Sequence, residues 1–278
     1  MSLYDELLQF QILPHARNDW AEYRTAVTAY LLQHTEPQSS VAVFGAGRCN
    51  DIDLREFRKH FSSVTLIDSN RDSMQEALAA YDLTDDPSMH LFSCDFTGIT
   101  PQDYRNFSDA LTSFCQVNGS RTDIRLLADY AVSGLDSLYV KADQHNPDFG
   151  TGCFDYSMAF GVHSQINSMA AWIFSAFAAQ LGQQEPSVES RIIRANDRLI
   201  PRLNDVILKA TKTAAFFGCE LKNTAVSGSI QGACQCIEDL HKRGIVTEQA
   251  VTLWPFDQNQ NIIYQMLIQK ASCTASSI

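Results

Sequence analysis

The chain of 278 residues is 45% apolar and carries a formal charge of −11. This length and apolar content suffice for one large α/β domain, with or without a small appendage. Because the net charge is negative, there is no broad positive field to attract nucleic acid or an anionic membrane surface, and neither is expected as a partner.

The first residues and the cysteines indicate in which cellular compartment the protein is expected. Residues 1–6 lack a basic region and an apolar run, and no window reaches the roughly 18 apolar residues of a membrane span. The eight cysteines lie mostly inside apolar runs and include neither a C-x-x-C pair nor finger-like Cys/His spacing. We therefore expect a cytoplasmic protein with reduced core thiols and no metal site.

The first third of the chain alternates helical and strand patterns. Residues 3–33 place apolar side chains at helical spacing around Pro14, which predicts two helices. Val41 to Phe44 is a short, fully apolar run of the kind found in central parallel strands. Residues 51–61 then predict a helix.

Two further strands follow, and each is predicted to end in an acid. The strand over 64–68 ends at Asp68, a helix is expected over 71–81, and the strand over 89–95 ends at Asp95. Three strands with interleaved helices predict a parallel, doubly wound α/β sheet.

The remaining elements complete this sheet. Residues 101–152 predict a helical insertion, and 1–37 a helical N-terminal extension to a domain over 38–278. The later part predicts a strand at 154–160, helices at 164–181 and 188–212, a strand at 213–219, a helix at 230–243, and strands at 251–256 and 262–268 with a hairpin-like loop between them.

The stretch Gly45-Ala-Gly47 follows the first strand directly. Glycine has no Cβ, so the chain can turn sharply there and a ligand can approach bare backbone. Alone this pattern is weak, and an ordinary tight turn is the alternative. However, open α/β sheets bind ligands at this place, and Asp68 lies about 20 residues on, where an acid accepts both ribose hydroxyls.

Asp95 adds a third point at the same edge of the sheet. It is placed to accept from the exocyclic amine of adenine, with Phe96 beside the ring; a turn or cap role is the alternative. The three points together predict an adenosine-type ligand. A dinucleotide is disfavoured because Asn50 occupies the third-glycine position, and because Asp51 and Asp53 suit a cationic ligand better than two phosphates.

These residues resemble class I S-adenosylmethionine-dependent methyltransferases. The resemblance rests on the stretch from Val41 to Asp51, the strand ending at Asp68, the segment Ser93-Cys-Asp-Phe96, the fourth-strand segment 154–166 and the terminal pair of strands over 251–270. It covers roughly residues 38–270 and implies a mostly parallel seven-stranded sheet that ends in an antiparallel hairpin. The sequence departs from the family at Val43, where an acid often stands, and at Cys49, which replaces a glycine.

The resemblance implies S-adenosylmethionine as cofactor and assigns expected roles to individual residues. Gly45, Ala46 and Gly47 would approach its methionine part. Asp51 would contact the ammonium group, or would cap the next helix. Asp68 would hold the ribose, and Asp95 with Phe96 would hold adenine. Ser69 and, in the fourth strand, Ala159 and Phe160 would make further contacts with the cofactor.

Methyl transfer is an in-line attack that positioning can support without a base. If a base exists, His163 is the candidate, since it follows the fourth strand; a capping or packed histidine is the alternative. We expect a methyltransferase acting on a small-molecule substrate. A non-catalytic binding module is the alternative, and an NAD-dependent oxidoreductase is disfavoured by Asn50 and the terminal hairpin. The sequence indicates no oligomeric state.

Overall fold

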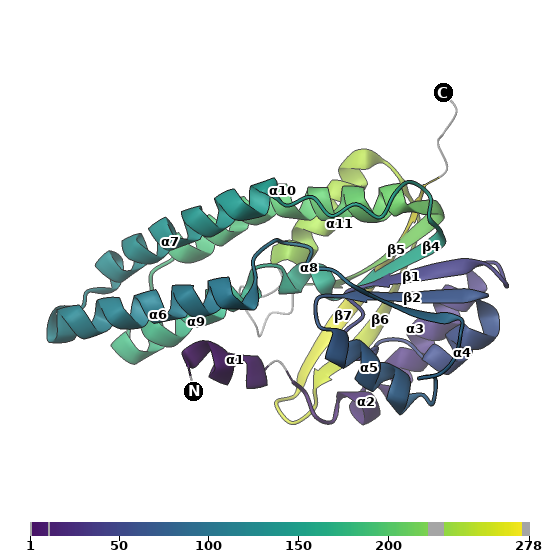
Figure 1. Ribbon diagram of the computed structural model, residues 1–278, viewed down its shortest axis with the longest axis horizontal. Helices are drawn as coiled ribbons and strands as arrows, with labels where there is room; N and C mark the ends of the chain where they lie inside the picture. The colour runs from purple at the N-terminus through teal and green to yellow at the C-terminus, as the bar shows by residue number, and fades with distance from the viewer. Residues whose placement is uncertain (1, 11, 222–230, 274–278) are drawn as a thin grey trace. The chain divides into compact units, whose positions relative to one another are not determined.

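The computed structural model describes residues 2–10, 12–221 and 231–273 (Figure 1). The chain forms two compact units. The helical unit comprises Met1–Leu13, Asp95–Asn146 and Gln165–Ile200, and the sheet unit comprises Pro14–Cys94, Pro147–Ser164 and Pro201–Ile278. The predicted boundaries at 37 and at 101–152 stay a prediction.

The sheet unit is built on a seven-stranded sheet in the order β3-β2-β1-β4-β5-β7-β6. Strands β1 to β5 pair in parallel, and β7 pairs antiparallel with both β5 and β6. The predicted fold class, including the C-terminal antiparallel hairpin, is confirmed. The strands are β1 (Ser40–Phe44), β2 (Ser63–Asp68), β3 (Met89–Ser93), β4 (Phe154–Phe160), β5 (Thr211–Leu221), β6 (Val246–Asp257) and β7 (Ile262–Ser272).

Strand β1 lies in the interior of the sheet because its side chains are apolar on both faces. Val41 to Phe44 are all buried, and Val41 stands in register between Val64 of β2 and Tyr156 of β4. Strand β3 lies at the edge of the sheet and ends at Ser93. Its residues alternate less regularly between buried and exposed. The expectation that this strand ends at Asp95 was therefore wrong by two residues.

Capping side chains set where the helices after β1 and β2 begin. The Asp53 carboxylate accepts from the Arg55 amide at 2.9 Å, so α4 (Leu54–His60) begins later than the predicted residue 51. The amide oxygen of Asn70 accepts from the Ser73 amide at 3.1 Å and caps α5 (Arg71–Ala80). The further helices are α2 (Ala16–Asp19), α3 (Ala21–Gln33), α8 (Val162–Gln165) and α11 (Gln231–Arg243). The position 230 predicted to begin α11 lies outside the described residues.

The helical unit packs long amphipathic helices around one apolar core. Its elements are α1 (Leu3–Phe10), α6 (Pro101–Asn118), the 3-10 turn Gly119–Arg121, α7 (Ile124–Gln144), α9 (Ser168–Leu181) and α10 (Ser187–Ala210), which continues past Ile200 into the sheet unit. Figure 1 shows α6, α7 and α9 running alongside one another. Leu111, Leu135 and Ile173 are fully buried between them. Within the described residues, no helix is long and apolar enough to cross a membrane.

Candidate functional site

The loop after β1 turns through three left-handed residues. Gly45, Gly47 and Cys49 have φ angles of 67°, 49° and 50°. Glycine adopts this region at little cost, whereas other residues are strained there. Cys49 therefore occupies a glycine-like position, while Asn50, where the dinucleotide pattern requires a glycine, shows no positive φ. The amides of Gly45 and Ala46 donate to the Ile67 carbonyl at 2.8 and 3.1 Å, which ties the loop to β2.

The two glycines of this loop have different surroundings. A Cβ on Gly45 would lie 1.9 Å from Cγ2 of Val162, so this residue must lack a side chain for α8 to pack on the loop. A Cβ on Gly47 would meet no atom within 4 Å. Gly47 therefore leaves the open space that a ligand needs to approach the backbone.

Asp68 connects the end of β2 to the glycine loop. One carboxylate oxygen accepts from the Gly47 amide at 2.9 Å, and the other accepts from the Asn70 amide at 2.8 Å. An ionised carboxylate has about four lone-pair positions, so acceptor capacity remains for the hydroxyls of a ligand. Ser69, the next residue, is exposed.

An acidic cluster lies beside the loop, formed by Asp51, Glu220 of β5 and the hydroxyl of Tyr23 of α3. Burial raises the pKa of Asp51 to about 7; Glu220 adds to this, while Tyr23 and Arg24 act against it. Burial, and also the charges of Asp51 and Glu220, raise the pKa of Tyr23. Among the described residues, Oε2 of Glu220 is buried without a hydrogen-bond partner. This cluster offers acceptors and negative charge to a cationic group.

Aromatic rings pack beside the acidic cluster. Trp254 of β6 lies against Trp20 and Tyr23, with ring centroids 4.9 and 5.9 Å apart. A Cβ on Gly161, just after β4, would lie 3.6 Å from Oε1 of Glu220 and 3.9 Å from the Trp254 ring. Glu220 was not predicted as a site residue, because an acid inside an apolar run gives no sign of its neighbours on other strands.

The predicted fourth-strand contacts lie at the same end of the sheet. Ala159 is fully buried and stands in register with Phe44, the last residue of β1. Phe160 is buried opposite Gly218 of β5, where a Cβ would lie 2.2 Å from its ring. Both residues pack into the sheet, and their role in cofactor binding stays a prediction.

Asp95 and Phe96 begin the second segment of the helical unit. One carboxylate oxygen of Asp95 accepts from the Thr97 amide at 2.8 Å and from the Thr97 hydroxyl at 2.9 Å, while its carbonyl pairs with the His145 ring at 2.7 Å. Asp95 thus organises a turn, which was the alternative reading of this acid. A role of Asp95 and Phe96 in adenine binding stays a prediction.

His163 lies in the interior with 1% of its surface exposed. Its Nε2 lies 2.9 Å from the amide oxygen of Asn204, and its ring lies 5.8 Å from that of Phe217. Burial lowers the pKa of this imidazole, but Cys236 together with Asn204 and Glu220 outweighs burial, so the pKa is raised. Its role as a general base stays a prediction.

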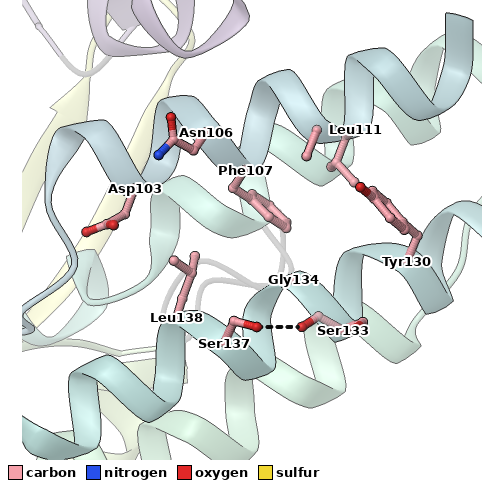
Figure 2. A pocket seen from close by; sticks show the side chains of 10 residues that line it. Asp103, Asn106, Phe107, Leu111, Tyr130, Ser133, Gly134, Ser137 and Leu138 are labelled. Carbon is pink, nitrogen blue, oxygen red and sulfur yellow. Dashed lines mark hydrogen bonds between the residues drawn. The ribbon is translucent and has the colours of Figure 1, made fainter.

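The helical unit contains a separate hollow of about 350 Å³ between α6 and α7. Figure 2 shows the rings of Phe107 and Tyr130 and the side chain of Leu138 along it, with Asp103 and Asn106 at one end. None of the residues predicted to bind a cofactor lines this hollow.

Comparison with solved structures finds methyltransferases at low sequence identity. Magnesium protoporphyrin IX methyltransferase from Synechocystis PCC 6803, solved with bound SAH, aligns with a TM-score of 0.45 and 11% identity over 92% of this chain and 83% of that chain. N-methyltransferase NodS from Bradyrhizobium japonicum WM9 aligns with a TM-score of 0.45 and 10% identity over 91% of this chain and 97% of that chain. No family model and no curated protein matches the sequence.

The strand order confirms the resemblance to class I methyltransferases at the level of the fold. The mostly parallel seven-stranded sheet with its antiparallel C-terminal hairpin is the arrangement that the resemblance implied, and the structure adds that β7 lies between β5 and β6. The fold places the ends of β1, β2 and β4 at one edge of the sheet, which is where ligands bind in open α/β sheets.

The two loop glycines allow a matched test of packing. Both Gly45→Ala and Gly47→Ala force alanine into a left-handed conformation, at a cost of about 1–2 kcal/mol each. Only Gly45→Ala also collides with Val162, which adds about 1–3 kcal/mol. Urea denaturation should therefore show the larger loss for Gly45→Ala, and Gly45→Ala combined with Val162→Ala should lose less stability than the sum of the two single variants. Equal losses for the two single variants would contradict the contact.

The raised pKa of Asp51 predicts how stability depends on pH. Its pKa is about 7 in the folded chain against 3.8 when unperturbed, so between these values the folded chain binds the extra proton. The contribution of Asp51 to stability is therefore greatest below pH 4 and declines as pH rises to about 7. Asp51→Asn should flatten this decline in urea denaturation at several pH values. The control is Asp72→Asn, at an exposed acid, which should leave it unchanged.

Proposed function

We propose that the chain binds S-adenosylmethionine at the carboxyl ends of β1, β2 and β4 and transfers its methyl group to a small-molecule acceptor. The observation that carries the proposal is the bond between the Asp68 carboxylate and the Gly47 amide at 2.9 Å. It holds the glycine loop open beside an acid that still has acceptor capacity. A structural turn alone requires no such open space over Gly47.

The residues of the sheet unit fit the parts of this cofactor. Asp68 would accept the ribose hydroxyls, and Gly47 would let the methionine part lie on the backbone. Asp51, Glu220 and Tyr23 would surround the ammonium group, which supplies the donor that Oε2 of Glu220 lacks. A bound cation favours the ionised form of Asp51, so the affinity should rise with pH up to about 7.

When bound, S-adenosylmethionine would supply an electrophilic methyl group for transfer to an acceptor lone pair. The chain's part is to bind and orient the two reactants, which is sufficient for an in-line transfer. Trp254, Trp20 and Tyr23 would exclude water beside the acidic cluster. The proposal assigns no step to His163, whose ring lies in the interior.

A small acceptor is favoured over a nucleic acid on charge grounds. The chain carries a formal charge of −11, and several of its arginines pair with nearby carboxylates, as Arg48 does with Glu76 and Arg58 with Asp86. Such pairs leave little positive potential to hold a phosphate backbone.

Calorimetric titration with S-adenosylmethionine and S-adenosylhomocysteine tests the cofactor site. The unmodified chain should bind both, and Asp68→Ala should reduce the affinity at least about 10-fold, because a charge-assisted hydrogen bond contributes about 1.5–3 kcal/mol. Asp72→Ala, at an exposed acid on α5, is the matched control and should bind normally.

Three outcomes separate the candidate functions. Binding that Asp68→Ala weakens, together with transfer of labelled methyl groups to a member of a metabolite pool, supports the enzyme. Binding without transfer to any acceptor leaves a cofactor-binding module. Absence of binding to the folded chain, with thermal protection by NADH, would overturn the proposal in favour of a nicotinamide enzyme.

A further inference from the structure

Three metal-binding side chains from separate elements meet inside the sheet unit. They are His163 of α8, Cys219 of β5 and Cys236 of α11. A ring nitrogen and the two sulfurs all lie within 4.8 Å of one another, and at most 1% of each residue is exposed. None of the three contributes to the proposed cofactor site, so this cluster needs its own explanation.

We propose that His163, Cys219 and Cys236 form a buried zinc site. Thiolate and imidazole are the ligands that zinc prefers in proteins, and three protein ligands leave a fourth position for a water molecule or another small ligand. Two thiolates and a neutral imidazole carry two negative charges, which Zn²⁺ cancels. A neutral complex is the form that a buried, weakly polar environment accepts at the lowest cost.

The spacing of the ligand atoms suits such an ion after a small adjustment. Zn–S bonds of about 2.3 Å and Zn–N bonds of about 2.0–2.1 Å in a tetrahedral site place two sulfurs about 3.8 Å apart and a sulfur about 3.6 Å from a nitrogen. The three atoms here lie within 4.8 Å of one another. Rotation of the cysteine side chains that moves the sulfurs by roughly 1 Å would bring the atoms to these bonding distances.

The histidine is held in the orientation that a ligand requires. Its Nε2 donates to the amide oxygen of Asn204 at 2.9 Å, so in the neutral ring, the form that binds a metal, Nδ1 carries the free lone pair. Among the described residues, this Nδ1 has no hydrogen-bond partner and is buried. A buried ring nitrogen without a hydrogen bond is costly, and a metal ion held between His163 and the two sulfurs would satisfy it.

A second layer of polar groups fixes Asn204 in turn. Its side-chain nitrogen donates to the Asp239 carboxylate at 2.8 Å, and Asp239 pairs with Arg243 at 2.8 Å. Ligating histidines usually donate their other ring nitrogen to such an oriented acceptor. The Cys236 thiol donates to the same Asn204 oxygen at 3.6 Å, an interaction that metal binding would replace.

Metal analysis of the purified chain is the first test. After preparation in a reducing buffer with trace zinc, we expect one zinc ion per chain. After chelation, titration with Co²⁺ should produce the intense near-ultraviolet bands of cobalt–thiolate bonds, and zinc should displace them. A chain that holds no zinc, and whose apo form gives no such bands, would overturn the proposal.

Variants locate the site. Cys219→Ser, Cys236→Ser and His163→Gln should each lower zinc content and weaken zinc binding at least about 10-fold, because losing even an outer partner of a ligand costs about that much. Cys153→Ser removes an exposed thiol elsewhere in the sheet unit and should keep one zinc ion per chain. Zinc content that survives all three ligand substitutions would place the ion elsewhere and overturn the proposal.

Two readouts remain decisive if a variant fails to fold. The cobalt spectrum of the unmodified chain reports sulfur ligation directly, and chelation should lower its melting temperature, because zinc binds the folded state. A disulfide between Cys219 and Cys236, found by mass spectrometry in a chain that binds no metal after reduction, would overturn the proposal. Cofactor titration of the zinc-free chain separates this site from the proposed methyl transfer.

Discussion

The bond between Asp68 and the Gly47 amide is the interaction on which the candidate site depends. It joins the end of β2 to the turn after β1, and it does so with an acid that keeps free acceptor positions. The turn itself is possible because Gly45 has no side chain where Val162 packs against it. Backbone conformation, packing and ligand access are therefore set by the same few residues.

The interior of the sheet unit contains polar and acidic side chains that do not contribute to its apolar core. Asp51, Glu220 and Tyr23 place two acids and a hydroxyl in an environment where charge is costly, as the raised pKa of Asp51 near 7 indicates. Such a group is stable when a cation offsets it. In the proposed cofactor site an organic cation would offset this charge, and in the proposed zinc site a metal ion would offset that of the thiolates.

The two sites use neighbouring elements for different tasks. Strand β5 contributes Glu220 to the acidic cluster and Cys219, the adjacent residue, to the metal cluster, because successive side chains of a strand point to opposite faces. On α8, two adjacent residues also belong to different clusters. The Ser164 hydroxyl donates to Glu220 at 2.6 Å, while His163 pairs with Asn204. A substitution at Cys219 or Glu220 therefore lies close to both proposed sites.

The sequence by itself determined the parallel sheet, the terminal hairpin and the positions of Gly45, Gly47 and Asp68, because these depend on local periodicity, on missing side chains and on the order of strands. It did not determine that Asp53 delays α4 or that Asp95 lies beyond its strand, since caps are settled by single side-chain bonds. Only the tertiary structure brought Cys219 and Cys236 to His163. Residues distant in sequence meet through strand pairing and helix packing, and no local spacing encodes that contact.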